Sequence, residues 1–247
     1  LDPMATGVLV LGVDRATRLL GHLMLTEKAY DATIRLGAVT TTDDAEGEVV
    51  STHDVGGVTE DDVRHQLARF VGDIEQVPTA VSAIKVDGKR AYARVRDGEQ
   101  VELKARPVTI HELVVHEVAL PDVRISVRCS SGTYIRAIAR DLGAALGVGG
   151  HLTALRRTAV GSFDLAAART LEQLTTDFAV LPIADAARAS FPTVDLGEEQ
   201  AAHVRFGRAL GLALPAEGPH AVFAPDGEFL ALYEKSGEQA RPVAVFV

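Results

Sequence analysis

An aspartate, a tyrosine and an arginine draw attention first, because proteins use these types as nucleophiles, bases and orienting charges. Asp2 precedes Pro3, which biases its backbone toward an extended conformation and stiffens the following turn, so the carboxylate is presented outside any helix. Taken alone, each residue has a simpler interpretation. Asp-Pro is usually a turn, Tyr30 alternates with apolar neighbours as a core tyrosine does, and Arg136 could hold a surface carboxylate.

The order of four sequence blocks changes that balance. Residues 1–9 read Leu-Asp-Pro-Met-Ala-Thr-Gly-Val-Leu, and residues 28–43 contain Lys-Ala-Tyr, Arg-Leu-Gly and Thr-Thr-Asp. Residues 78–92 contain Ser-Ala-Ile-Lys and Gly-Lys-Arg-Ala-Tyr, and residues 131–143 contain Ser-Gly-Thr-Tyr-Ile-Arg and Asp-Leu-Gly. Over about residues 1–185 the chain resembles the TruB-type pseudouridine synthases, the bacterial tRNA pseudouridine-55 family.

The resemblance implies an isomerase that converts one T-arm uridine of tRNA, at position 55, to pseudouridine without metal or cofactor. Asp2 would be the nucleophile, and Arg136 would pair with it, keep it ionised and orient it. Tyr30 would stack on the flipped uracil and remove the C5 proton. Leu155 matches the apolar position that packs against the target base, although an apolar core position is an equal alternative.

The resemblance also implies residues that bind the RNA. Tyr134 lies in the arginine block, and the segment 78–107 corresponds to an RNA-gripping thumb with Lys85, Lys89, Arg90 and Arg94. Two other classes stay open: a guide-RNA-dependent pseudouridine synthase, and a tRNA-binding folding factor without essential chemistry. The family places a histidine, a strand and a helix before its nucleophilic aspartate, so we expect further residues upstream of Leu1.

Three metal-like or phosphate-like patterns do not meet their requirements. The segment His111–His116 has three residues between Glu112 and His116, whereas a zinc-protease helix needs two, and it alternates like a strand. The acidic run 43–48 resembles a calcium loop. With Gly47 at the sixth position of such a loop, Thr42 would stand at the first position, where a carboxylate is required. The glycine-rich residues 147–150 resemble a phosphate-binding loop but contain no lysine. They follow a predicted helix and are better interpreted as its C-terminus. We therefore expect no metal.

The elements that position these residues predict an α+β fold with a central mixed, largely antiparallel sheet and flanking helices. Alternating patterns predict strands at 29–36, 108–118 and 123–129, and an apolar run predicts a buried strand at 8–13. Helical patterns cover 16–24, 60–70, part of 132–146, a segment after the Thr170 to Gln173 capping box, and 198–210. We expect a catalytic domain over 1–188 and a small PUA-like β-barrel over 189–247.

Charge is distributed unevenly. The 247-residue chain has a formal net charge of −9, yet residues 82–106 and 124–157 are both basic, and these two segments are candidate RNA-binding faces. No apolar run is long enough to cross a bilayer, and Cys129 is the single cysteine. We expect a cytoplasmic monomer whose partner is tRNA and which binds no membrane.

Overall fold

The computed structural model describes residues 1–24, 26–79, 85–86, 89–90 and 103–247. The chain divides into two compact units. One contains residues 1–9 and 25–166, and the other contains residues 10–24 and 167–247. Each unit has its own cluster of buried apolar side chains, so each is described by itself.

The first unit is built on a seven-stranded sheet with the order β1-β10-β2-β9-β8-β5, and β11 pairs with β10 outside this path. Only the pairing of β1 with β10 is parallel. The sheet is therefore mixed and largely antiparallel, as predicted. Its strands are β1 (Thr6–Gly7), β2 (Lys28–Leu36), β5 (Gly72–Gln76), β8 (Arg106–Ala119), β9 (Asp122–Cys129), β10 (Gly150–Val160) and β11 (Phe163–Asp164).

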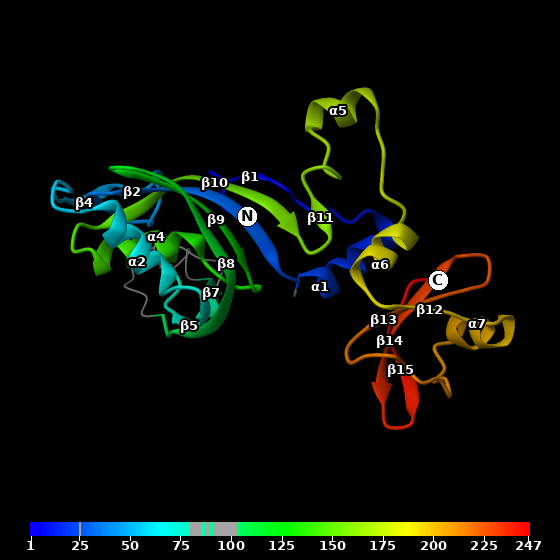
Figure 1. Ribbon diagram of the computed structural model, residues 1–247. Helices are drawn as coiled ribbons and strands as arrows, with labels where there is room; N and C mark the ends of the chain where they lie inside the picture. Colours follow the sequence, from blue (N-terminus) through cyan, green and yellow to red (C-terminus); the bar gives the residue numbers. More distant parts are fainter. Residues whose placement is uncertain (25, 80–84, 87–88, 91–102) are drawn as a thin grey trace. The chain divides into compact units, whose positions relative to one another are not determined.

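The predicted strand at 29–36 is confirmed, and its period-2 pattern explains the core. Tyr30, Ala32, Ile34 and Leu36 are buried on one face of β2, while the residues between them are exposed or half-buried. The helices α2 (Glu60–Ala68) and α4 (Ile135–Ala145) contribute buried side chains to the same cluster. Figure 1 shows both helices on one side of the sheet.

Two helix ends explain how α2 and α4 are placed. Thr59 and Asp62 form a reciprocal capping box at the start of α2. Helix α4 approaches β10 so closely that a Cβ at Gly143 would lie 2.1 Å from the backbone of Gly149 and Gly150. Glycine is therefore required at this point, and the close contact fixes the helix that carries Arg136 against the sheet.

Two short hairpins accompany the main sheet. Strands β3 (Ala38–Thr40) and β4 (Val49–Thr52) pair antiparallel and flank the acidic connector, residues 41–48. Strands β6 (Lys85–Val86) and β7 (Lys89–Arg90) also pair antiparallel. The turn predicted at Asp87-Gly88 between them lies outside the described residues.

The predicted strand at 8–13 is wrong. Beyond Val8 the chain leaves the sheet, and Leu9 and Leu11 are 60% and 75% exposed. An apolar, β-branched run indicates a preference for extended backbone and does not establish that a neighbouring strand is available. The helix predicted for 16–24 is present as two short pieces, the 3-10 helix η1 (Asp14–Arg18) and α1 (Leu20–Leu23).

The second unit contains a four-stranded sheet with the order β12-β13-β14-β15. The sheet is open, because β12 and β15 are its edges, so the predicted β-barrel is not confirmed. Helix α5 begins at the predicted capping box of Thr170 and Gln173. The elements are α5 (Leu171–Thr176), α6 (Ile183–Ser190), β12 (Thr193–Asp195), α7 (Glu198–Arg205), β13 (His220–Phe223), β14 (Phe229–Ser236) and β15 (Gln239–Val245).

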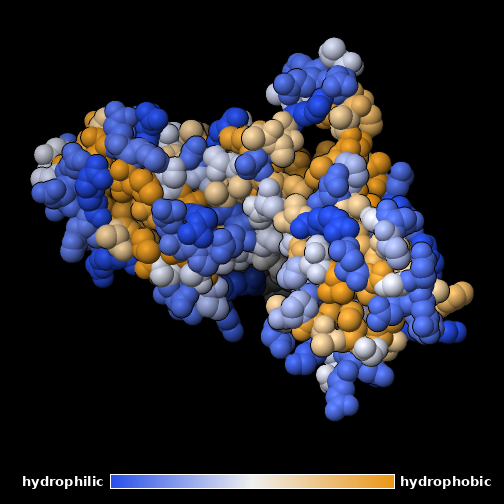
Figure 2. Space-filling view, turned by 45° about the vertical axis from the view of Figure 1, so that its right-hand side comes forward, coloured by the Kyte–Doolittle hydropathy of each residue, from blue (hydrophilic) through white to orange (hydrophobic). Residues whose placement is uncertain are grey.

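The surface carries both polar and apolar side chains. Figure 2 shows apolar patches among hydrophilic surface on the face that it displays. Leu171, Phe178 and Phe206 of the second unit are each more than 70% exposed. Among the described residues, no helix is long and apolar enough to cross a membrane.

Candidate active site

Asp2 lies in a tight turn just before β1. Its backbone oxygen accepts a hydrogen bond from the nitrogen of Ala5 at 3.0 Å, and Met4 and Ala5 pack against the core of the first unit. Gly7 then adopts a φ of 96°, and a Cβ there would lie 2.1 Å from the Arg157 carbonyl oxygen. The turn is thus held by the packing of Met4 and Ala5 against the core and by the pairing of β1 with β10. The Asp2 side chain stays 32% exposed.

Arg136 lies in the first turn of α4 and binds Asp2 through two nitrogens. Nε lies 3.0 Å from Oδ2, and Nη2 donates to Oδ1 at 3.1 Å. The arginine side chain is only 6% exposed. Contact with both carboxylate oxygens fixes the orientation of the carboxylate beside the guanidinium.

The third nitrogen of Arg136 binds the acidic connector. Nη1 donates to the carbonyl oxygen of Thr42 at 2.9 Å and to Oδ2 of Asp44 at 3.2 Å. The Asp44 side chain is 3% exposed, so this second ion pair is buried. One guanidinium therefore joins a buried carboxylate to a partly exposed one.

Asp44 is held in turn by the connector itself. Its Oδ1 accepts hydrogen bonds from the Thr42 hydroxyl and from the Glu46 nitrogen, and its backbone oxygen accepts one from the Thr40 hydroxyl at 2.8 Å. The sequence analysis did not single out Asp44, because it considered the acidic run 43–48 only as a possible calcium loop. The only local signal was the Thr-Asp-Asp turn, since the partner arginine is 92 residues away.

A second arginine of α4 binds the same connector one helical turn later. Arg140 lies 3.5 Å from Oδ2 of Asp43, and it also pairs with Asp141 and donates to the carbonyl oxygen of Val77. Burial raises the pKa of Asp43, and the charges of Arg140 and Arg136 oppose that rise. Helix α4 is thus tied to the connector at two successive turns.

Tyr30 lies in β2 with only 9% of its surface exposed. Burial is the largest cause that raises the pKa of its phenol, and the Cys129 thiol and Asp2 raise it further, whereas Arg157 lowers it by its charge and by a side-chain hydrogen bond. The net direction is upward, so the phenol is neutral at rest. The effect of Asp2 indicates that Tyr30 and Asp2 lie within electrostatic reach of each other.

The other sequence-predicted site residues fall into three groups. Leu155 is buried in β10 opposite Ala32 and belongs to the same core cluster as Tyr30. Tyr134 is the N-cap residue of α4, where the side chain of Gln76 binds both its backbone nitrogen, at 2.8 Å, and its backbone oxygen, at 3.1 Å. The backbones of Lys85, Lys89 and Arg90 are placed in β6 and β7 without description of their side chains, and Arg94 lies outside the described residues.

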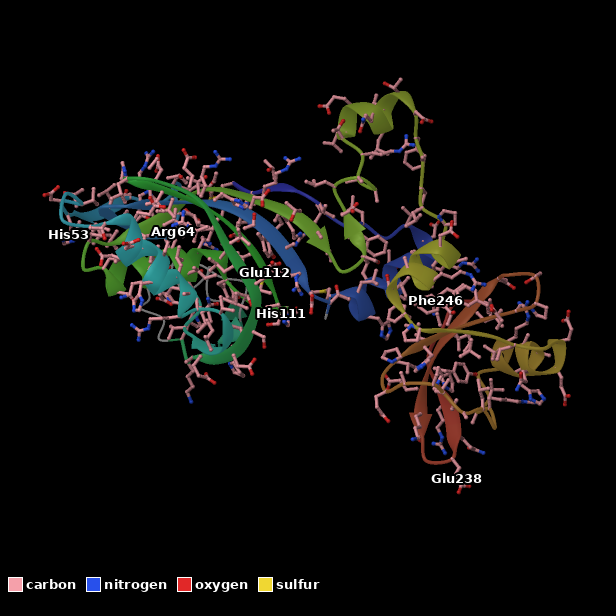
Figure 3. The ribbon with its side chains drawn as sticks, viewed as in Figure 1. His53, Arg64, His111, Glu112, Glu238 and Phe246 are labelled. Atoms are coloured by element: carbon pink, nitrogen blue, oxygen red, sulfur yellow. The ribbon has the colours of Figure 1, made fainter. Side chains whose placement is uncertain are left out.

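Figure 3 shows His111 and Glu112 on β8, which explains why their spacing does not form a helical metal motif. Within the described part of the chain, no group of three or more His, Cys, Asp or Glu side chains is arranged to hold a metal ion.

The mixed sheet holds an aspartate bound by an arginine and a buried tyrosine, and the family models that match the chain give its class, the pseudouridine synthases. The model of the TruB family pseudouridylate synthase N-terminal domain matches residues 1–135. The model of the tRNA pseudouridylate synthase B C-terminal domain matches residues 136–185, and that of the tRNA pseudouridine synthase II C-terminal region matches residues 191–247. The chain belongs to the TruB family and is an enzyme, an isomerase.

Curated relatives and solved structures agree with this family. The tRNA pseudouridine synthases B of Arthrobacter sp. (strain FB24) and Streptomyces griseus are each 56% identical over 100% of this chain and 85% of the relative. A chain in the structure of an H/ACA RNP bound to a substrate RNA containing 2′-deoxyuridine has a TM-score of 0.73 and 24% identity, covering 100% of this chain and 74% of that one. A chain in a Cbf5-Nop10-Gar1 complex has a TM-score of 0.73 and 23% identity, and the match covers 100% of this chain and 74% of that one. These two structures share the fold.

Proposed function

We propose that this enzyme converts the uridine at position 55, in the T-arm of tRNA, to pseudouridine. Its curated relatives are named tRNA pseudouridine synthase B, which supports tRNA as the substrate. The observation that carries the proposal is the bidentate contact between Arg136 and Asp2, backed by the buried carboxylate of Asp44.

The reaction requires a nucleophile, a base and space for a nucleotide that has left its stack. The bond between N1 and C1′ breaks, the uracil turns, a bond forms between C5 and C1′, and the C5 proton leaves. Asp2 acts as the nucleophile in this scheme, because its carboxylate is oriented by Arg136 and partly exposed. Arg136 orients it, and Asp44 holds Arg136 in place whether or not substrate is bound.

Tyr30 is the proposed base and stacking surface. Its raised pKa makes it a neutral phenol at rest, so its ionisation has to be assisted when it removes the C5 proton. Leu155 and Tyr134 form the apolar and aromatic surroundings of the flipped base in this proposal. The isomerisation is redox-neutral, so we propose that it needs no cofactor and no metal.

RNA binding is assigned to the thumb and, more weakly, to the C-terminal unit. Lys85, Lys89, Arg90 and Arg94 are proposed to bind phosphates of the T-arm. The C-terminal unit is proposed to be a PUA-like module, with α7 and the open sheet β12 to β15 as its core. The domain limits 1–188 and 189–247, the monomeric state and a cytoplasmic location are part of the same proposal.

The test is release of tritium from C5-labelled uridine in a T-arm stem-loop incubated with the pure protein. Release equal to one tritium per target uridine, followed by detection of pseudouridine at that position, is the expected result. A requirement for an added guide RNA would favour the guide-dependent alternative. Tight binding of the stem-loop without any release would instead make the chain a folding factor.

A further inference from the structure

Arg157 is a buried cation that the reaction scheme above does not use. It lies in β10 and is 9% exposed, whereas its neighbour Arg156 is exposed. Among the described residues, no carboxylate forms an ion pair with it. A buried charge is costly unless polar groups compensate it, so the partners of Arg157 are informative.

Its first partner is the backbone that follows Asp2. Nε of Arg157 donates to the carbonyl oxygen of Val8 at 2.8 Å, and the nitrogen of Val8 donates to the carbonyl oxygen of Arg157 at 2.8 Å. The close approach of Gly7 to the same carbonyl, described above, belongs to this contact. Arg157 therefore holds the start of the chain, and with it the turn of Asp2, against β10.

Its second partner is Tyr30. The two residues are Cα partners in the antiparallel pairing of β10 with β2, so their side chains lie on the same face of the sheet. Arg157 is also the group that lowers the pKa of the Tyr30 phenol, against the burial that raises it. The buried cation is thus shared between the segment of the nucleophile and the phenol of the candidate base.

We propose that Arg157 is a positioning residue that holds the Tyr30 hydroxyl and stabilises its ionised form for removal of the C5 proton. The inference rests on the proposed function. The C5–H bond breaks and its electron pair forms the C5–C6 double bond, while the C5 proton passes to the phenolate oxygen of Tyr30. The π electrons between C6 and N1 pass to N1, which takes up a proton from water. The resulting phenol later returns this proton to water. Arg157 transfers no proton in this step.

The electrostatic surroundings of Tyr30 give the direction of the expected effect. The groups that face it are Arg157 from β10, the Cys129 thiol from β9 and Asp2 from the turn before β1. The charge of Arg136, on helix α4, is engaged by Asp2 and Asp44 and is not among the causes that shift the pKa of Tyr30. Of the three facing groups, Arg157 alone lowers the pKa of Tyr30, so its removal raises that pKa further.

The first experiment titrates tyrosinate absorbance in the absence of RNA. The chain has four tyrosines, and subtraction of the titration of Tyr30→Phe isolates the signal of Tyr30. Arg157→Met is expected to shift that signal to higher pH by at least about one pH unit, which corresponds to tenfold less phenolate at neutral pH. Arg156→Met, on the same strand and exposed, is the matched control and should titrate as the wild type does.

The second experiment measures the single-turnover rate against pH with saturating enzyme. In Arg157→Met the rate near neutral pH should fall about tenfold and continue to rise at pH values where the wild type has levelled off. Arg157→Lys keeps the charge and should recover part of the rate. In the Tyr30→Phe background, Arg157→Met should cause no further loss.

The inference is overturned if Arg157→Met leaves the Tyr30 titration unchanged, or if it lowers the rate by one factor at every pH with no recovery in Arg157→Lys. Should Arg157→Met not fold, Arg157→Gln keeps a donor for Val8, lacks the charge, and must show the same titration shift. The titration needs no turnover. A shifted titration without tritium release in the wild type would therefore overturn the proposed function while leaving the contact between Arg157 and Tyr30 intact.

Discussion

Arg136 binds two carboxylates that differ in accessibility. Asp44 is 3% exposed and Asp2 is 32% exposed, so one partner is fixed in the interior while the other is accessible to solvent. A guanidinium that has a permanent buried partner keeps its position when the exposed partner moves or reacts. This asymmetry suits an arginine that orients a nucleophile through a multistep reaction.

Asp2→Asn is expected to abolish turnover while leaving tRNA binding within a few-fold of the wild type. The amide keeps the shape of the side chain but is a poor nucleophile, and Arg136 retains Asp44. Tritium release and a binding isotherm measured on the same preparation check this. Multiple turnover by the pure variant would end the assignment of Asp2 as the nucleophile.

Arg136→Lys distinguishes an orienting arginine from one that binds phosphate. Lysine keeps the charge and loses the planar fork that contacts both oxygens of Asp2, so the single-turnover rate should fall far more than the affinity for tRNA. A phosphate-binding arginine would behave in the opposite way. Near-normal chemistry with weakened binding would contradict the ion-pair role.

Asp44→Asn tests the buried partner. Arg136 would lose a buried counter-charge, and we expect a lower single-turnover rate together with a loss of about 1–3 kcal/mol in the free energy of unfolding. Asp43→Asn, at the neighbouring position, is the matched control. Because burial already raises the pKa of Asp43, neutralising it should cost less stability. Equal effects of the two substitutions would remove the special role of Asp44.

At the scale of the elements, sequence patterns predicted what local periodicity encodes. The alternation over residues 29–36 and the helical pattern over 60–70 correspond closely to β2 and α2. The buried strand predicted at 8–13 was wrong. The composition of this run is typical of a buried strand, but whether another strand lies beside it depends on the rest of the chain.

Within the candidate site, only the residues that belong to the ordered sequence motifs could be predicted from the sequence. Asp2, Tyr30 and Arg136 were singled out because they stand in recognisable blocks. Asp44 and Arg157 were not, because their importance arises from burial and from contacts made 92 and 127 positions away in the chain. No local periodicity encodes such contacts.

The thumb, the segment 78–107, is rich in basic residues. If its basic side chains bind phosphates, neutralising two of them should reduce the log–log salt dependence of tRNA binding by about one to two units, at ~0.7 per phosphate on single-stranded RNA. Binding isotherms at several salt concentrations measure this slope. The residues to combine in pairs are Lys85, Lys89, Arg90 and Arg94, together with Arg96 of the same segment 78–107.

A matched control for the thumb uses arginines that are already neutralised. Arg35 forms a bidentate pair with Asp122, and Arg64 pairs with Glu60. Replacing both by glutamine should leave the salt slope unchanged. If the thumb variants also leave the slope unchanged, this segment is ordinary surface.

At the scale of the whole molecule, the two units have separate cores, so their stabilities should separate too. Leu230→Ala, at a fully buried position of the second unit, should cost about 2–5 kcal/mol of that unit's stability. Ile138→Ala, also fully buried, should act on the first unit. Denaturant unfolding followed by limited proteolysis measures both. A single transition shifted equally by either variant would mean that the units unfold as one.

The path of the chain between the units has a consequence for biosynthesis. Residues 10–24 belong to the second unit, although the rest of that unit begins only at residue 167. Their contacts reach its far end, since Arg15 donates to the carbonyl oxygen of Phe246 at 3.0 Å and Arg18 lies over the Phe246 ring, which is labelled in Figure 3. On the ribosome, this early segment waits roughly 10 to 45 s for its partner, at 5–20 residues per second. During that interval Leu19 and Leu23, which are 2% and 5% exposed in the folded protein, lack the later residues of their unit and stay accessible to water.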